Sequence, residues 1–236
     1  MTGSAPYHEP MGQTKRIESP DGGTDAYLAL PPSPPGPGVV ALHAWWGLNQ
    51  DFRHFVDRLA TDGFTVIAPD LFDGTVLDTI EDAERFGEEL DEEHNADRLL
   101  GRAAASLDHL LSLPEAGAAR AAVLGFSFGA VYARWLAKTR PEVAAVVTYY
   151  GGTWDPPGET SSAPWLSHWA AEDPYEGADD ARQAVAAQPG AVSHFYDGTK
   201  HWFAEPARPE YVEAASELAY RRTVEFLRQV LGEGVA

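Results

Sequence analysis

The sequence predicts a single domain of the α/β class, in which helices cover both faces of a mostly parallel sheet. Apolar, strand-like runs alternate along the chain with segments whose apolar residues recur at helical spacing. The later runs, such as 143–150, are apolar at successive positions, as in parallel strands that are buried on both faces. A Gly-x-Ser-x-Gly motif at 125–129 lies between one such run and a helical segment, which is typical of a strand–turn–helix unit.

The elements follow a polar segment, residues 1–13, that we expect to be flexible. A turn signal at 21–23 predicts an opening hairpin of strands 15–18 and 26–30, and the proline-rich stretch 31–37 predicts a surface connection. The α/β domain is expected to span residues 14–236, without a second domain or an internal repeat. Its further strands are predicted at 39–42, 64–68, 121–125, 143–150, 164–170 and 192–196, and its helices at 50–61, 78–87, 91–113, 131–138, 178–187 and 211–231.

The composition is strongly acidic. Asp and Glu number 36 against 17 Lys and Arg, which gives a formal net charge of −19 over 236 residues. Such a surface repels nucleic acids and anionic membranes, so neither is expected as a partner. The acidic residues are spread along the chain rather than grouped in a block, which favours solubility or adaptation to salt over a dedicated acidic tail.

The chain has no cysteine, which excludes disulfides, thiolate metal sites and a cysteine nucleophile. Residues 1–13 lack the basic and apolar regions of a signal peptide, and no run of about eighteen apolar residues predicts a membrane span. We therefore expect a cytoplasmic protein that acts on a small molecule and has no metal site. The sequence does not indicate whether it is a monomer or a homo-oligomer.

The Gly-x-Ser-x-Gly motif predicts a nucleophile elbow at Ser127. On a sharp turn between a strand and a helix, the serine hydroxyl points out at the top of the sheet. Gly125 and Gly129 lack a Cβ, so that strand and helix can pack closely around the bend. An ordinary strand–helix turn is the competing interpretation of the motif taken alone.

A serine nucleophile needs a base and a group that orients the base. Asp173 follows strand 164–170, and His201 follows strand 192–196, so the chain order Ser, Asp, His is that of α/β-hydrolases. We expect Ser127 to attack a carbonyl carbon, His201 to take its proton and Asp173 to hold the histidine tautomer. Asp155, after strand 143–150, is the alternative acid, and its position fits the template less well.

The oxyanion hole is expected to use the backbone N–H of Phe128, the residue after the nucleophile, and that of Trp45 in the loop after strand 39–42. An aromatic pocket suits apolar or aromatic acyl and alcohol groups. The substrate is therefore predicted to be a neutral, small-to-medium ester or lactone. The pocket is predicted to be lined by residues of the site loops: Trp46, Tyr149, Tyr150, Trp154 and Trp202.

Six segments together resemble the dienelactone hydrolase family. The resemblance spans roughly residues 14–230 and is far more specific than the elbow alone. It implies a single-domain α/β-hydrolase fold that hydrolyses esters and lactones without a cofactor. The segments are HAWWGLN at 43–49, GFTVIAPDLF at 63–72, GFSFGA at 125–130, VTYYG at 147–151, AEDPY at 171–175 and HWFA at 201–204.

The chain departs from the family's pattern at the nucleophile and at the substrate site. Ser127 stands where the family usually has cysteine, and Ala44 lies in the segment where the family usually has the glutamate that accompanies it. Glu205 and the loop 73–75 replace arginines that bind the substrate carboxylate in dienelactone-cleaving members. Dienelactone itself is therefore not the expected substrate. The sequence leaves open whether Arg53, Arg85 or Arg208 reaches the pocket, and whether the segment 159–162 is a lid.

Two alternatives remain beside the ester or lactone hydrolase. Amide or thioester hydrolysis, or acyl transfer, would use the same three residues, because all pass through an acyl-enzyme. A catalytically silent protein of this fold that binds a ligand is the other alternative, since a fold does not by itself define a function.

Overall fold

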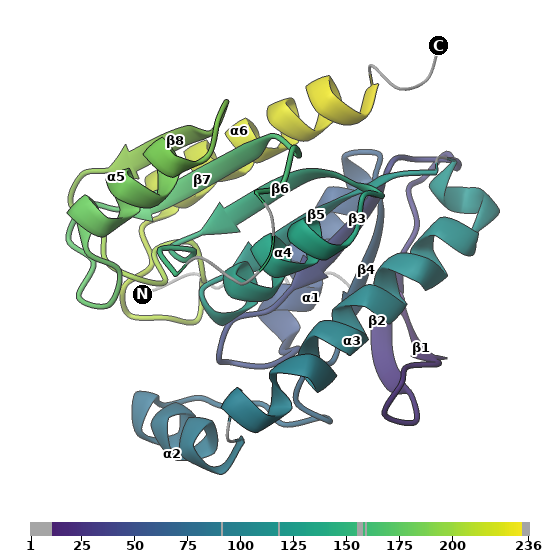
Figure 1. Ribbon diagram of the computed structural model, residues 1–236, viewed down its shortest axis with the longest axis horizontal. Coiled ribbons are helices and arrows are strands. Elements are labelled where there is room, and N and C mark those ends of the chain that lie inside the picture. The colour runs from purple at the N-terminus through teal and green to yellow at the C-terminus, as the bar shows by residue number, and fades with distance from the viewer. Residues whose placement is uncertain (1–10, 91, 118, 155–157, 159, 233–236) are drawn as a thin grey trace, which may run out of the picture.

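Eight strands form one sheet in the computed structural model, which describes residues 11–90, 92–117, 119–154, 158 and 160–232 (Figure 1). The strand order is β1-β2-β4-β3-β5-β6-β7-β8. Strands β4, β3, β5, β6, β7 and β8 are parallel, and the β1–β2 hairpin joins the β4 edge in the antiparallel sense. The strands are β1 (Gln13–Ile17), β2 (Thr24–Ala29), β3 (Gly38–Leu42), β4 (Thr65–Pro69), β5 (Ala121–Phe126), β6 (Val143–Tyr149), β7 (Trp165–Ala170) and β8 (Val192–Tyr196).

Helices cover both faces of this sheet. Helices α1 and α6 pack on one face, and α3, α4 and α5 pack on the other, while α2 projects beyond the sheet beside the start of α3 (Figure 1). Within the described ranges, no helix has the length and apolar character needed to cross a membrane. The helices are α1 (Gln50–Thr61), α2 (Ile80–Leu90), α3 (Glu92–Ser112), the 3-10 helix η1 (Pro114–Ala116), α4 (Phe128–Thr139), α5 (Ala178–Ala187) and α6 (Glu213–Gly232).

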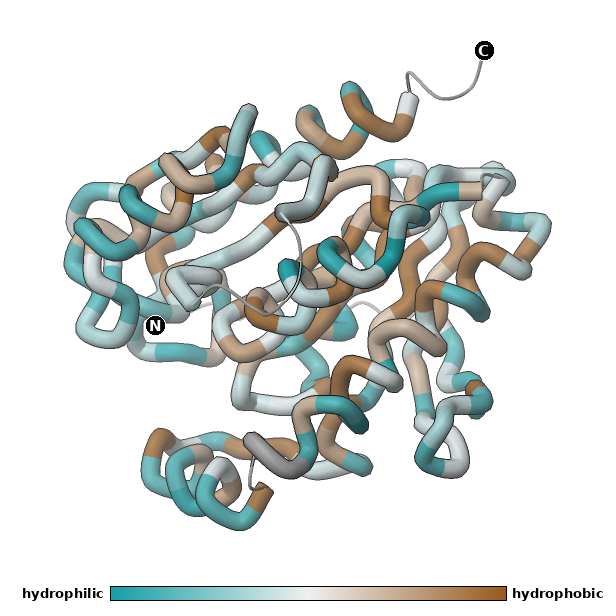
Figure 2. The backbone as a smooth tube through the Cα atoms, in the orientation of Figure 1, coloured by the Kyte–Doolittle hydropathy of each residue, from teal (hydrophilic) through white to brown (hydrophobic). Residues whose placement is uncertain are grey.

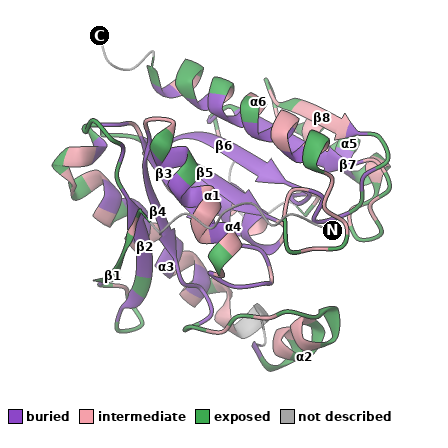
Figure 3. Ribbon diagram, turned by 180° about the vertical axis from the view of Figure 1, so that it is seen from behind, coloured by how far each residue is buried: buried purple, intermediate pink, exposed green. Residues whose placement is uncertain are grey.

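A hydrophobic core lies on each face because the central strands are apolar at almost every position. All residues of β5 and β6 are buried (Figure 3). Apolar residues concentrate in these strands and in the helix sides that face them (Figure 2). Burial of this apolar surface is the main favourable contribution to the folding free energy. The sheet thereby becomes a rigid base for the loops at the carboxyl ends of its strands.

The predicted fold class is confirmed: the chain is a mostly parallel sheet covered on both faces. The predicted strands and helices all occur, with boundaries that agree to within three residues. Two details differ from expectation. Strand β8 is an edge strand, so four of its five residues are only partly buried or exposed, and the short helix η1 carried no periodic signal because it has only three residues.

Candidate active site

The turn at Ser127 is possible only because two glycines flank it. Ser127 has φ of 48° and ψ of −112°, in a region that few L-residues occupy. A Cβ on Gly125 would lie 2.3 Å from the carbonyl oxygen of Gly129, and a Cβ on Gly129 would lie 2.4 Å from the carbonyl oxygen of Leu42. The backbone at the start of α4 therefore lies so close to the backbone of β5 and of the end of β3 that no side chain fits between them. This close packing goes with the sharp turn at Ser127.

Ser127, His201 and Asp173 form one hydrogen-bonded chain at the carboxyl edge of the sheet. Ser127 Oγ lies 2.8 Å from His201 Nε2, and His201 Nδ1 lies 2.8 Å and 3.0 Å from the two carboxylate oxygens of Asp173. The side chains of His201 and Asp173 are 5% and 1% exposed. With Nδ1–H donating to the carboxylate, Nε2 keeps a lone pair for the serine hydroxyl proton, which is the arrangement that general-base activation requires.

Two loops hold the histidine and the carboxylate in register. Asp173 Oδ1 also accepts backbone N–H groups from Tyr175 and Glu176, at 2.9 Å and 3.0 Å. The loop after β7 is tied to the loop after β8 by the N–H of Glu172, which donates to the Thr199 carbonyl at 3.0 Å. The orientation of the carboxylate is thus fixed by the backbone.

The two residues predicted to form an oxyanion hole lie next to each other. Phe128 is the first residue of α4, so its N–H has no acceptor within the helix. Trp45 lies in the turn after β3, and its ring centroid is 4.5 Å from that of Phe128. The assignment of their N–H groups to an oxyanion hole stays a prediction.

A cavity of about 400 Å³ opens in front of Ser127 and His201, and we call it the serine cavity. Of the residues predicted at the site, Trp45, Trp46, Trp202 and Phe128 line it. Helix α2 forms one wall, which was not predicted from the sequence. The signal there is weak: an apolar pair, Ile80 and Ala83, three residues apart on the helix. Tyr175, whose ring centroid is 5.1 Å from that of His201, was also not predicted. The complete lining is Trp45, Trp46, Ile80, Ala83, Glu84, Gly87, Ser127, Phe128, Val131, Tyr175, Glu176, His201 and Trp202.

Three residues predicted to line the pocket lie elsewhere. Tyr149 points to the opposite face of the sheet, where its hydroxyl hydrogen-bonds to Thr223 at 2.7 Å. Tyr150 is completely buried behind His201, at 5.0 Å between ring centroids. Trp154 is 50% exposed and lies edge-on to Trp135. Side chains alternate between the two faces of a strand, and the backbone of Tyr150, just after the strand, has a φ of 37°. The position of a residue in a site loop therefore did not predict the direction of its side chain.

None of the three arginines left open by the sequence lines the serine cavity. Arg53 donates to the Leu48 carbonyl, and Arg85 pairs with Asp82 on the exposed side of α2. Arg208 stacks over the Trp46 ring, with its guanidinium carbon 3.7 Å from the centroid. The carboxyl groups of the lining are instead those of Glu84 and Glu176.

Two other segments considered above are placed only in part. Asp155, the alternative acid, and residue 159 of the possible lid lie outside the described residues. In the described part of that segment, the carbonyl of Ser161 accepts a hydrogen bond from the Gln188 side chain at 2.6 Å, on a side of the molecule away from the serine cavity.

Burial shifts the pKa of two glutamates near this site. Desolvation raises the pKa of Glu176, although the N–H of Thr153 donates to its carboxylate at 3.3 Å. Desolvation also raises the pKa of Glu205, to about 8, against the effect of a hydrogen bond from the Tyr150 hydroxyl at 2.8 Å. Among the described residues, no group of three or more His, Asp or Glu side chains is arranged to hold a metal ion.

The parallel sheet, the strained serine elbow and the Ser127–His201–Asp173 chain define a protein of the α/β-hydrolase fold. Residues 24–231 match the dienelactone hydrolase family. The chain belongs to this family and is a hydrolase that acts on ester bonds.

Individual relatives agree with this placement. The carboxymethylenebutenolidase of Rhodococcus opacus is 28% identical over 223 residues, 85% of this chain and 84% of that protein. Protein usf of Aquifex pyrophilus is 30% identical over 145 residues, and the match spans 60% of this chain but only 62% of that protein. The solved structure designated m3DLH is 27% identical, with a TM-score of 0.75, over 95% of this chain and 98% of that chain.

Proposed function

We propose that the protein hydrolyses a neutral, small-to-medium carboxylic ester or lactone through an acyl-enzyme on Ser127. The observation that carries the proposal is the hydrogen-bonded chain from Ser127 through His201 to Asp173, set on a strained elbow. Such strain persists only where the surroundings hold it, and it is concentrated at functional sites. The family and the names of the relatives support ester or lactone cleavage as the reaction class.

The roles follow from the distances. Ser127 Oγ attacks the carbonyl carbon while His201 Nε2, 2.8 Å away, takes the hydroxyl proton. The N–H groups of Phe128 and Trp45 stabilise the oxyanion that forms. The intermediate then expels the alcohol, which receives the proton from His201. Water, deprotonated by the same histidine, releases the acid and restores Ser127. With a lactone, the alcohol stays attached to the acyl group.

Preference for a neutral substrate rests on the charges of the serine cavity. Glu84 and Glu176 line it, and neither arginine nor lysine does so among the described residues. A substrate carboxylate would lie beside two carboxyl groups and find no cation among the described residues of the lining, which is unfavourable. The aromatic rings of Trp45, Trp46 and Trp202 instead offer apolar contact to the acyl and alcohol groups.

The test is the mass of the intact protein after incubation with a fluorophosphonate, with Ser127→Ala as the control. We expect one adduct on the native chain and none on the variant. A folded native chain that forms no adduct would exclude an activated Ser127. Hydrolysis of neutral esters and lactones is then measured, with an added alcohol or amine to detect acyl transfer in place of hydrolysis.

A further inference from the structure

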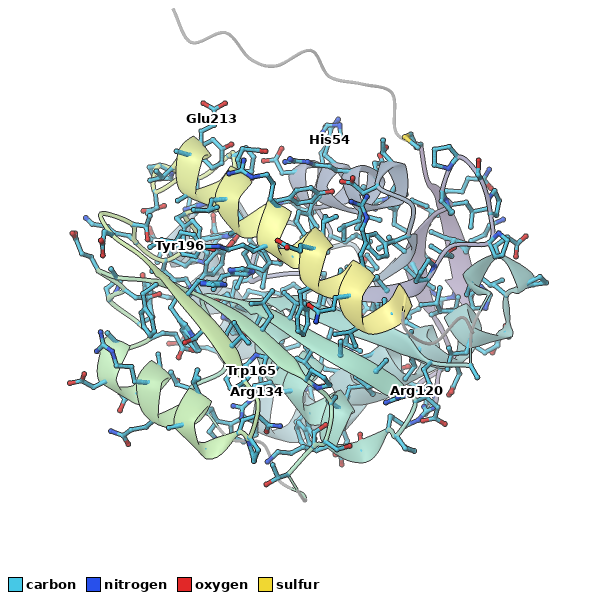
Figure 4. All side chains as sticks on the ribbon, turned by 90° about the horizontal axis from the view of Figure 1, so that it is seen from above. His54, Arg120, Arg134, Trp165, Tyr196 and Glu213 are labelled. Carbon is cyan, nitrogen blue, oxygen red and sulfur yellow. The ribbon has the colours of Figure 1, made fainter. Side chains whose placement is uncertain are left out.

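A second cavity lies on the other side of the elbow, between α1 and α6. Its volume is about 170 Å³, and it shares no lining residue with the serine cavity. Figure 4 shows α6 and α1, the helix that carries His54, on one side of the sheet. The loop after His201 closes one end. The lining is Asp51, Phe52, His54, Phe55, Arg58, Phe126, Tyr149, Ala204, Glu205, Pro206, Tyr211, Ser216, Glu217 and Tyr220.

The size and walls of the second cavity suit a single aromatic ring. An apolar cavity of about 150 Å³ is large enough to hold benzene. Phe126 and Tyr149, the last residues of β5 and β6, stack with centroids 4.3 Å apart. Phe55 meets Phe126 edge-on at 4.9 Å and Tyr220 at 5.7 Å. Phe126 and Tyr149 are only 2% and 1% exposed, so they close the floor of the cavity, and the partly buried Phe55 is the ring of this group that a ligand reaches.

The polar groups of the second cavity favour a cation. Glu217 is paired with Arg58 through two contacts of 2.5 Å and 2.6 Å, and the Arg58 guanidinium lies 3.6 Å above the Tyr220 ring. The wall thus already holds one cation between a carboxylate and an aromatic face. Asp51 and Glu205 form no ion pair with any described residue. Arg208 is near enough to Glu205 to lower its pKa, and Asp51 opposes that effect.

We propose that the second cavity binds a small arylalkylammonium ion, with its ring against Phe55 and its ammonium group beside Asp51 and Glu205. The ring gains apolar contact with Phe55, and the ammonium adds a positive charge beside two carboxyl groups that form no ion pair with a described residue, which favours their ionised forms. A carboxylate ligand of the same size would be disfavoured by the same groups. A neutral ligand would leave their ionisation unchanged.

The second cavity is connected to the serine cavity by one side chain. The Tyr150 hydroxyl donates to Glu205 Oε1 at 2.8 Å, and the Tyr150 ring packs 5.0 Å from the His201 ring. An ammonium beside Glu205 favours the ionised carboxylate, which strengthens the hydrogen bond from Tyr150. We therefore expect the ligand to alter turnover at Ser127. This consequence rests on the proposed function, whereas the binding itself does not.

The experiment is calorimetric titration of the full chain at neutral pH with benzylammonium, and with benzyl alcohol and benzoate as neutral and anionic controls. For a ligand of this size we expect a Kd of about 1 mM for benzylammonium, and at least tenfold weaker binding of both controls. Glu205→Gln should weaken benzylammonium binding at least fivefold. Glu84→Gln, which removes a carboxylate from the serine cavity, should leave that binding unchanged.

Three results would overturn the proposal: benzyl alcohol binding as tightly as benzylammonium, no heat of binding at ten times the expected Kd, or loss of binding in Glu84→Gln but not in Glu205→Gln. The last would place the ammonium in the serine cavity. Should Glu205→Gln not fold, Asp51→Asn at the partly exposed start of α1 tests the same carboxyl pair. Failure of the proposed function appears separately, as a chain that binds benzylammonium but forms no adduct at Ser127.

Discussion

The loops after β7 and β8 each place a carboxyl group near His201, and the two groups differ in the number of donors that reach them. Asp173 receives three N–H groups, from His201 and from the backbone of Tyr175 and Glu176. Among the described residues, the Glu205 carboxylate receives a hydrogen bond from the hydroxyl of Tyr150 alone. Burial raises the pKa of Glu205 to about 8, which this hydrogen bond and Arg208 oppose and which Asp51 and Glu210 reinforce.

The same contrast separates the two cavities. Next to the serine cavity, Asp173 accepts N–H groups from His201 and from the backbone, so all of its partners come from the chain itself. In the second cavity Asp51 and Glu205 form no ion pair with a described residue, although Arg208 faces Glu205. We propose the first arrangement for chemistry on a neutral substrate and the second for binding of a cation.

Replacement of the two carboxyl groups by amides should give the largest difference. Asp173→Asn is expected to lower kcat on the order of 10⁴-fold, because an amide no longer holds the His201 tautomer that accepts the serine proton. Glu205→Gln keeps an acceptor for Tyr150 and should lower kcat less than about tenfold. Steady-state kinetics on a neutral ester measures both, with circular dichroism to verify folding. Equal losses in the two variants would contradict the distinction drawn between the two carboxyl groups.

The charge of the substrate should give the next largest effect. We expect a neutral ester to be hydrolysed about 10- to 100-fold faster, in kcat/KM, than its carboxylate analogue, because Glu84 and Glu176 repel the anion. Glu176→Gln should narrow this ratio about fivefold. Glu89→Gln, on the exposed face of α2, is the matched control and should leave the ratio unchanged. A carboxylate analogue that reacts faster than the neutral ester would contradict the proposed substrate class.

The ionisation of Glu205 should be visible in the stability of the fold. Its pKa of about 8 lies above the ordinary value of 4.5, so the folded chain keeps a proton that the unfolded chain releases. The stabilisation is fully present below pH 4.5 and falls as the pH rises to about 8, by up to about 1.4 kcal/mol per pH unit. Urea unfolding of the native chain and of Glu205→Gln at several pH values measures the effect: the free energy of unfolding of the native chain should fall relative to that of the variant as the pH rises from about 4.5 to about 8.

Comparison with the Glu205→Gln variant separates the effect of Glu205 from that of two histidines whose stabilisation changes with pH in the opposite direction. Burial lowers the pKa of His43, to about 4, and of His168, so both favour folding as the pH rises to about 6.5. They are present in both chains and cancel. Arg208, Asp51 and Glu210 also face Glu205 and are unchanged. A difference that stays constant with pH would mean that Glu205 is ionised in the folded chain.

The smallest expected effect links the second cavity to this proton. Benzylammonium bound beside Glu205 favours the carboxylate, so binding at pH 7 should release a fraction of a proton per ligand. Titrations in buffers of different ionisation enthalpy measure that fraction. Glu205→Gln should abolish the release, while Asp51→Asn should weaken binding and retain it. Binding without proton release would show that the ammonium does not lie beside Glu205.

The sequence by itself determined the helices and strands, and it determined the features of the site that depend on the order of residues along the chain. The α/β class, the sharp turn at Ser127 and the order Ser, Asp, His follow from periodicity and from glycines that no other residue can replace. Parallel strands place their carboxyl ends at one edge, so residues that follow β5, β7 and β8 necessarily lie near one another. This is why Asp173 and His201 could be chosen from the sequence.

Only the tertiary structure decided which way side chains point and which groups are buried together. Tyr149 ends β6, and Tyr150 and Trp154 follow it, yet Tyr149 packs under α6, Tyr150 lies behind His201 and Trp154 is half exposed. The wall formed by α2 and the second cavity join segments far apart in the chain. Their packing sets the desolvation that raises the pKa of Glu205. Desolvation depends on every neighbour in space, and a linear pattern records only the neighbours along the chain.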